Sequence, residues 1–204
     1  GDWVLETACR QVGELETLDL PPGFAAAVNI SARQFSDPGF LDRVHRVTAA
    51  AGIALERLKL ELTESSLVQD PGRARRVLEA LRGMGIRIEL DDFGTGYSSL
   101  TSLKSLPLDT LKLDGSLVRD VEGNGSDAAI LRAAIAMARA LSLRVVAEGV
   151  ETEAQRRLLV GEGCDVLQGY LIARPMPFAA LAERLSAEYG PAPDPGLAPD
   201  ARRA

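Results

Sequence analysis

The sequence has few of the residues on which most nucleophilic and histidine-ligated sites depend. His45 is the single histidine among 204 residues. This excludes a histidine-rich metal site and any Ser-His or Cys-His catalytic pair that does not use His45 itself. The two cysteines, Cys9 and Cys164, form no CxxC spacing. We therefore expect two buried thiols in a protein of the reducing cytoplasm.

Long apolar runs and a surplus of basic residues are also missing. No apolar run reaches the roughly 18 residues of a membrane-spanning helix, and no signal-peptide pattern opens the chain, so we expect no membrane segment in it. The 29 aspartates and glutamates outnumber the 23 lysines and arginines, which gives a net charge of −6. Because affinity for a phosphate backbone needs clustered Lys and Arg, this balance argues against DNA as a partner. A small anionic ligand held through metal is compatible with it.

The chain alternates strand-like and helix-like segments with short connections, which predicts an α/β fold with a parallel sheet. Strands are predicted near 24–30, 57–62, 86–91, 109–114, 143–148 and 164–168. Helices are predicted near 2–17, 38–52, 70–84, 98–105, 125–141, 152–162 and 178–188. Residues 1–189 suit one domain, whereas residues 190–204 hold four prolines and few large apolar residues, so we expect a disordered tail there.

Polar residues close every predicted strand. They are Asn29, Glu61, the pair Asp91 and Asp92, Lys112 with Asp114, Glu148, and Gln168. In residues 58–62 the leucines share one face and Glu61 takes the other, because side chains alternate along a strand. If the leucine faces pack against helices, the polar residues cluster at the C-terminal mouth of a barrel, where (β/α)8 barrels build their active sites. Any one of them alone could instead be a solvated strand end.

The strongest motif is the run from Asp91 to Leu100, DDFGTGYSSL. It sets two adjacent carboxylates at the end of an apolar strand, directly before a glycine-rich loop. Adjacent carboxylates repel each other by about 1–4 kcal/mol at exposed to half-buried sites. A divalent metal is the commonest reason for a protein to bring them together.

This run closely resembles the signature of the EAL family, which hydrolyses the bacterial messenger cyclic di-GMP. The resemblance extends in family order and spacing to about residue 188. Further matching segments are 2–11 (DWVLETACRQ), 28–35 (VNISARQF), 60–65 (LELTES), 108–114 (LDTLKLD), 145–152 (VVAEGVET), 168–170 (QGY) and 175–177 (PMP). It implies a TIM-like (β/α)8 barrel of the EAL type, with about six of its eight strands in this chain.

The chain departs from the family at its name-giving motif. No Glu-Ala-Leu tripeptide occurs, and the first two barrel strands would lie upstream of Gly1. In the family that Glu binds metal, and an Arg just after it holds a substrate phosphate. We therefore expect either a piece of a longer chain or a shortened domain, with the former favoured.

The resemblance also implies residue roles. Two Mg²⁺ or Mn²⁺ ions, bridged by Asp91, would be bound by Asn29, Glu61, Asp91, Asp92 and Glu148. Lys112, Asp92 and Glu148 would be catalytic: Lys112 would hydrogen-bond the attacking water or a phosphate oxygen, and Asp92 would assist deprotonation. Gln168, Asp114 and Arg33 would contact substrate or position water. The loop and its anchors would comprise Glu64, Phe93, Gly94, Thr95, Gly96 and Glu151.

The family implies partners as well. The loop after Asp92 would take part in a homodimer, and a sensor or GGDEF (diguanylate cyclase) domain would lie upstream. The product would be linear pGpG.

Two other readings remain open. One is a catalytically silent EAL domain that acts as a cyclic di-GMP receptor or interaction module. The other is a barrel metal enzyme with an unrelated substrate, such as a lyase with Lys112 as base. Glu89 is a separate question, because alternation points it inward one layer below Asp91, where an unpaired carboxylate is costly. Lys59 and Arg87 are its possible partners.

Overall fold

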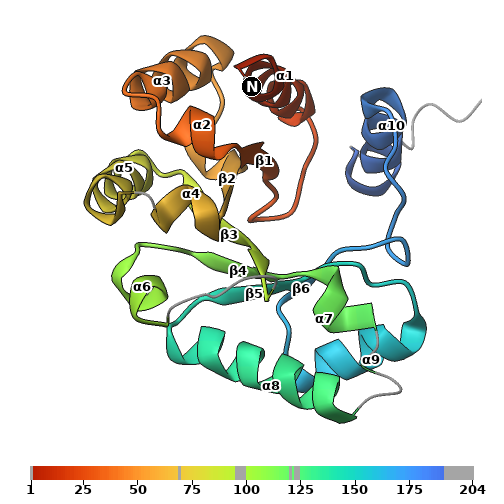
Figure 1. The fold of residues 1–204 in the computed structure, drawn as a ribbon. Helices are drawn as coiled ribbons and strands as arrows, with labels where there is room; N and C mark the ends of the chain where they lie inside the picture. Colours follow the sequence, from red (N-terminus) through yellow and green to blue (C-terminus); the bar gives the residue numbers. More distant parts are fainter. Residues whose placement is uncertain (1, 69, 95–99, 120, 122–124, 191–204) are drawn as a thin grey trace, which may run out of the picture.

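The six predicted strands form one parallel sheet whose spatial order follows the chain, β1-β2-β3-β4-β5-β6. A computed structural model describes residues 2–68, 70–94, 100–119, 121 and 125–190. The sheet curls into part of a barrel, with the helices around its outside (Figure 1), which confirms the predicted α/β barrel architecture. The strands are β1 (Ala26–Ile30), β2 (Leu58–Thr63), β3 (Arg87–Phe93), β4 (Thr110–Leu113), β5 (Arg144–Ala147) and β6 (Val166–Leu167).

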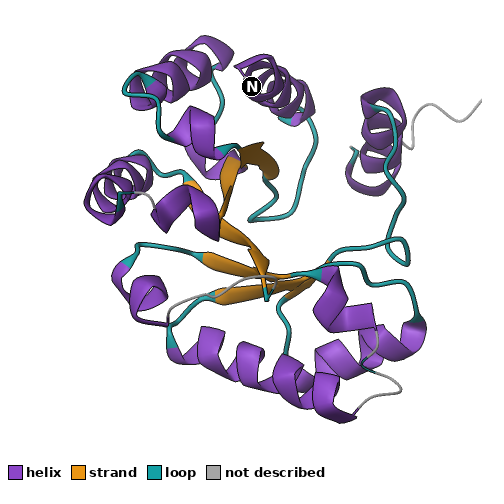
Figure 2. Ribbon diagram, in the orientation of Figure 1, coloured by secondary structure: helices purple, strands orange, loops and turns teal. Residues whose placement is uncertain are grey.

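Helices connect each strand to the next and cover the outer face of the sheet (Figure 2). They are α1 (Asp2–Leu15), α2 (Ala32–Phe35), α3 (Phe40–Ala51), α4 (Glu64–Val68), α5 (Pro71–Gly83), α6 (Leu100–Ser105), α7 (Gly115–Arg119), α8 (Gly125–Ala140), α9 (Glu153–Glu162) and α10 (Phe178–Tyr189), with a 3₁₀ turn at Leu55–Arg57. Within the described ranges, no helix is both long and apolar enough to cross a membrane.

The core forms as the leucine pattern of the strands predicts. Leu58, Leu60 and Leu62 of β2 are fully buried and belong to one apolar cluster with Leu78 and Leu81 of α5. Burial of one such leucine side chain stabilises the fold by about 1.5–3 kcal/mol. The opposite faces of the strands therefore point into the barrel, where polar residues remain.

Three short helices were not predicted. Each of α2, α4 and α7 has four or five residues and begins one or two residues after a strand ends. Segments of one turn are too short for a 3.6-residue apolar period to be recognised. They matter because they start at the mouth of the barrel, directly after the candidate site residues.

The C-terminal helix α10 lies beside the connection from α1 to β1. Leu185 packs with Leu15 and Leu20, and the Asp19 N–H donates to the Tyr189 carbonyl at 3.1 Å. The predicted tail begins at Gly190, and its residues 191–204 lie outside the described part of the chain.

Candidate active site at the C-terminal ends of the strands

Lys112 of β4 lies at the centre of three carboxylates. Its Nζ is 2.9 Å from Glu61 Oε2, 2.9 Å from Asp91 Oδ1 and 2.6 Å from Glu148 Oε1. Glu61 is on β2, Asp91 is on β3, and Glu148 directly follows β5. Only 3% of Lys112 is exposed. The buried ammonium has three N–H donors, and these three carboxylates provide an acceptor for each.

The electrostatics of this cluster keep Lys112 charged. Burial by itself lowers the pKa of Lys112, but hydrogen bonds to Glu148, Asp91 and Glu61 outweigh it and raise that pKa above its usual range. Burial also raises the pKa of Glu61 and Glu148, and the lysine partly offsets that effect. A lysine that serves as a base needs a lowered pKa, so the geometry disfavours the alternative of a lyase with Lys112 as base.

A bulge in β3 brings both adjacent aspartates to this cluster. Leu90 pairs with Leu111 and Phe93 pairs with Leu113, so Asp91 and Asp92 together oppose Lys112. This is the two-against-one count of a β-bulge. Asp92 takes a left-handed φ of 58°, a conformation in which Asp is enriched among non-glycine residues. Strict alternation would have turned Asp92 to the opposite face.

Asp92 is the more exposed of the two aspartates. Partial burial first, then the negative charges of Asp91 and Asp114, raises its pKa. A carboxylate whose pKa is raised toward neutrality accepts a proton more readily.

The five predicted metal ligands lie at the same end of the sheet. Asn29 is exposed on the edge strand β1 and is the register partner of Glu61. Glu61, Asp91 and Glu148 contact Lys112, and Asp92 follows Asp91 at the bulge. Their carboxylate and amide oxygens suit hard divalent ions such as Mg²⁺ or Mn²⁺. Among the described residues, however, no three His, Cys, Asp or Glu side chains are placed as a metal cluster. The carboxylates converge on Lys112 Nζ instead, so the metal roles remain predictions that the donor chemistry fits.

Glu89 is paired with Lys59, one of the two partners considered from sequence. Lys59 Nζ lies 2.8 Å from Glu89 Oε1, and Glu89 is 2% exposed. Within the described chain that oxygen accepts no well-oriented hydrogen bond, so the contact is an ion pair. Glu89 is also the register neighbour of Glu61, which places this pair directly beside the Lys112 cluster.

Asp114 and Gln168, the predicted substrate contacts, directly follow β4 and β6, which lie on either side of β5. Asp114 Oδ1 accepts a hydrogen bond of 2.9 Å from the Ser116 N–H at the start of α7. Hydrogen bonds from the Ser116 side chain and backbone lower the pKa of Asp114. Gln168 follows β6 with its side chain exposed, and its N–H donates to the Ala147 carbonyl at 2.8 Å. Asp114 therefore has a structural partner, whereas the Gln168 amide faces solvent.

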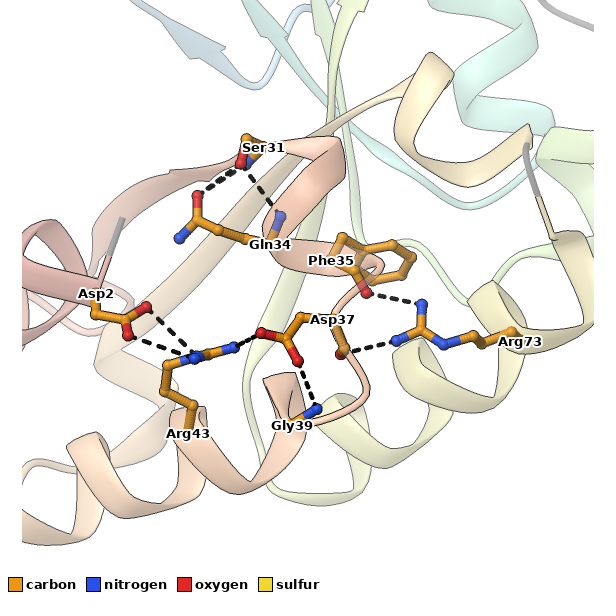
Figure 3. Close-up of polar contacts among 8 residues, drawn as sticks. All are labelled: Asp2, Ser31, Gln34, Phe35, Asp37, Gly39, Arg43 and Arg73. Atoms are coloured by element: carbon orange, nitrogen blue, oxygen red, sulfur yellow. Dashed lines mark hydrogen bonds and ion pairs between the residues drawn. The ribbon is translucent and has the colours of Figure 1, made fainter.

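Arg33 lies on α2 at the rim of this end of the sheet. It is exposed and lines a pocket of about 740 Å³ between α1, α2 and α3. Figure 3 shows the polar contacts among residues that line that pocket and their neighbours. Arg43 pairs there with Asp37 and Asp2, and Arg73 donates to the Phe35 and Asp37 carbonyls at 2.8 and 2.9 Å. These contacts hold α2 in place, and with it Arg33.

The predicted loop is only partly described. Phe93 ends β3 and its carbonyl accepts from the Asp114 N–H at 3.2 Å, while Glu64 begins α4. The Glu151 N–H donates to Gln155 Oε1 at 2.8 Å, in the turn that starts α9. Gly94 is described, but Thr95 and Gly96 lie outside the described residues. The predicted dimer contact through this loop therefore stays a prediction.

Analysis of the sequence assigned Gly94 and Gly96 to the loop but gave no role to three other glycines at the mouth. Each of these follows a predicted catalytic or substrate-binding residue at a strand end: Asp114-Gly115, Glu148-Gly149 and Gln168-Gly169. The repeated pair of a polar residue and a glycine was the sequence pattern that could have indicated a role for these glycines.

Comparison with known proteins identifies relatives of this chain. The family model described as "EAL domain" matches residues 1–175. The protein named bifunctional diguanylate cyclase/cyclic di-GMP phosphodiesterase MucR, from Pseudomonas aeruginosa, is 46% identical over 180 residues. The match covers 87% of this chain and 26% of that protein. The chain thus spans about a quarter of the length of this relative.

Solved structures share the fold. The EAL domain of Mycobacterium smegmatis DcpA superposes with a TM-score of 0.87 at 39% identity, over 94% of this chain and 86% of that one. A manganese and cyclic di-GMP complex of Klebsiella pneumoniae BlrP1 gives a TM-score of 0.76 at 31% identity, over 85% of this chain and 44% of that one.

Proposed function

The chain belongs to the EAL domain family, and we propose that it hydrolyses cyclic di-GMP to linear pGpG in bacterial second-messenger signalling. The observation that carries this proposal is the set of three carboxylates on Lys112, with Asp92 beside them at the bulge. The printed name of MucR as a cyclic di-GMP phosphodiesterase supports the choice of substrate.

Two Mg²⁺ or Mn²⁺ ions would be held by Asn29, Glu61, Asp91, Asp92 and Glu148. Such ions, when bound, lower the pKa of water and neutralise the charge that develops on a phosphate. The manganese complex of BlrP1 supports this part of the proposal.

The chain's own side chains have separate tasks. Lys112 holds Glu61, Asp91 and Glu148 together through its fixed positive charge, which the raised pKa preserves. Asp92, whose pKa is raised, would accept a proton from the attacking water. The water oxygen bonds to phosphorus, one P–O ester bond breaks, and the leaving ribose oxygen takes up a proton.

Substrate contacts would come from the rim of the mouth. The exposed Gln168 amide can donate or accept hydrogen bonds, and the exposed Arg33 guanidinium can pair with a phosphate. Asp114 would act by positioning, since its Oδ1 is engaged by Ser116.

The proposal extends to the setting of the domain. It includes a homodimer through the loop after Asp92, an upstream sensor or GGDEF domain, and a cytoplasmic location for the reaction. The bifunctional name of MucR supports the GGDEF partner.

The test is to incubate the chain with cyclic di-GMP and Mn²⁺ and to separate the nucleotides by chromatography. The proposal expects pGpG from the unmodified chain and none from Asp91→Asn, which keeps the size of the side chain but removes its charge. Binding of cyclic di-GMP without product from either protein would instead favour a receptor. That alternative has its own support, because the carboxylates already converge on Lys112.

A further inference from the structure

The loops at the mouth of the barrel contact each other through glycine. After β4, β5 and β6 the chain continues as Asp114-Gly115, Glu148-Gly149 and Gln168-Gly169. Each glycine directly follows a side chain to which we assign a role at the site. The backbone conformation at these three glycines therefore affects where the side chains of Asp114, Glu148 and Gln168 lie.

Gly149 lies too close to Gly115 for a β-carbon on Gly149 to make an ordinary contact. A β-carbon on Gly149 would lie 3.1 Å from the Cα of Gly115, tighter than ordinary van der Waals contact. Gly149 also has a left-handed φ of 66°, which disfavours any residue with a β-carbon. From the other side, a β-carbon on Gly115 would lie 3.5 Å from the Cα of Gly149 and 3.7 Å from the Glu148 carbonyl oxygen.

Gly169, in the loop after β6, also lies too close to a neighbouring segment for a β-carbon. A β-carbon on Gly169 would lie 2.2 Å from the carbonyl oxygen and 2.3 Å from the nitrogen of Val150. Val150 also donates its N–H to the Gln168 carbonyl at 3.0 Å. The segment around Gln168 therefore packs directly on the segment that carries Glu148.

Backbone hydrogen bonds tie these contacts to the strands. The Glu148 N–H donates to the Leu113 carbonyl at 3.1 Å, and the Asp114 N–H donates to the Phe93 carbonyl at 3.2 Å. Glu148 is thus fixed by its own N–H on one side and by the Gly149–Gly115 contact on the other. Its carboxylate reaches Lys112 at 2.6 Å.

We propose that Gly149 is a positioning residue: its close contact with Gly115 determines where the Glu148 carboxylate meets Lys112. The consequence for activity rests on the proposed hydrolysis of cyclic di-GMP, but the consequence for geometry does not. A β-carbon at Gly149 presses on the Cα of Gly115 and forces the two loops apart by a few tenths of an ångström, which moves Glu148 as well.

Gly52 provides a matched control for the backbone strain. It ends α3 with a φ of 67°, almost equal to that of Gly149, but a β-carbon there would meet nothing within 4 Å. Gly52→Ala and Gly149→Ala therefore impose a similar left-handed strain, and only Gly149→Ala breaks a close contact. Gly115→Val is the complementary variant, since Gly115 has no left-handed φ. A β-carbon there makes an ordinary contact of 3.5 Å with Gly149, so only the two valine methyl groups beyond it would press on Gly149.

The experiment measures kcat and KM for cyclic di-GMP with Mn²⁺ and determines crystal structures of the three variants. A misplacement of about 1 Å can cost about 100-fold in rate. The contact at Gly149 requires a shift of only a few tenths of an ångström, so we expect Gly149→Ala to lower kcat by about 3- to 10-fold with little change in KM. We expect a smaller loss of kcat in Gly115→Val and none in Gly52→Ala. In the crystals, the distance of 2.6 Å between Glu148 and Lys112 should lengthen in the first two variants and stay unchanged in Gly52→Ala.

Two results would overturn the inference. One is a Gly149→Ala structure in which the contact between Glu148 and Lys112 keeps its length. The other is a Gly115→Val protein in which both that contact and kcat are unchanged, because strain at Gly149 would then explain the first variant. If the unmodified chain gives no product, the proposed function fails, yet the crystal structures still decide the positioning. If Gly149→Ala does not fold, Gly115→Val carries the test.

Discussion

Lys112 Nζ donates a hydrogen bond of 2.9 Å to Asp91 Oδ1 across the bulge in β3. Glu61 and Glu148 take the other two contacts of the same ammonium. Three carboxylates, two of them buried and Glu148 partly buried, therefore depend on one positive charge. Removing that charge leaves buried carboxylates without compensation.

Lys112→Met should therefore destabilise the protein strongly. Breaking a buried ion pair by removal of one partner costs about 3–5 kcal/mol, and here three carboxylates lose their partner. Urea unfolding followed by circular dichroism measures the change in free energy of unfolding. Lys104→Met on α6 is the control, because Lys104 is exposed. A loss under about 1 kcal/mol in Lys112→Met, the usual limit for exposed ion pairs, would show that the lysine does not neutralise the cluster.

The Lys59–Glu89 pair allows a sharper test of buried charge. Lys59→Met leaves Glu89 buried at 2% exposure and should cost about 3–5 kcal/mol. The double variant Lys59→Met with Glu89→Met should be about as stable as the original protein, since replacing both partners of a buried pair by apolar residues is often neutral or stabilising. The same urea titration gives all three values. Equal losses in the single and the double variant would contradict the assigned pair.

Asp114 should make stability depend on acid pH. Its pKa is lowered from 3.8 by the hydrogen bonds of Ser116, so the folded protein releases this proton more readily than the unfolded chain. The contribution is therefore fully present above pH 3.8 and is lost as the pH falls through the lowered pKa. Relative to Asp114→Asn, we expect an advantage of about 0.3–1 kcal/mol at pH 7, typical of a charge at a helix N-terminus.

Thermal or urea unfolding of both proteins between pH 2 and 7 measures this difference. The advantage of Asp114 should shrink at the acid end. A difference that is constant with pH would mean that the carboxylate is not hydrogen-bonded in solution as it is here.

The two cysteines should differ in reactivity. Cys9 of α1 is 0% exposed, and burial raises its pKa to about 11. Cys164 is only partly buried, although burial raises its pKa too. Because the thiolate is the reactive form, Cys164 should react slowly with Ellman's reagent at pH 8, and Cys9 only on unfolding. Cys164→Ser isolates Cys9, and rapid labelling of that folded variant would contradict the packing of α1 on the core.

The sequence could predict the strands because their patterns are local. Each strand lies within about three residues of its predicted place, since an apolar run bounded by turns specifies position without knowledge of the partner strand. The polar residues at the strand ends were predictable for the same reason. Parallel strands bring their C-terminal ends to one edge, so Glu61, Asp91 and Glu148 had to come near one another.

The details of the site were not local and could not be predicted. The bulge is a mismatch between β3 and β4, so it appears only when both strands are paired. The choice of Lys59 over Arg87 as partner of Glu89 depends on side-chain conformations in the barrel. The Gly149–Gly115 contact joins two loops more than 30 residues apart. Each of these three features forms only when the strands are assembled into the sheet.

The central claim is that the carboxylates gathered by Lys112 form a cyclic di-GMP phosphodiesterase site, and the most direct test compares initial rates of pGpG formation. The unmodified chain, Lys112→Met and Lys104→Met would be assayed with Mn²⁺ and cyclic di-GMP at a temperature where all three are folded. The account predicts pGpG from the unmodified chain and from Lys104→Met at similar rates, with at least about a 100-fold loss in Lys112→Met. Product from Lys112→Met at the rate of the unmodified chain, or no product from any of the three, would contradict it.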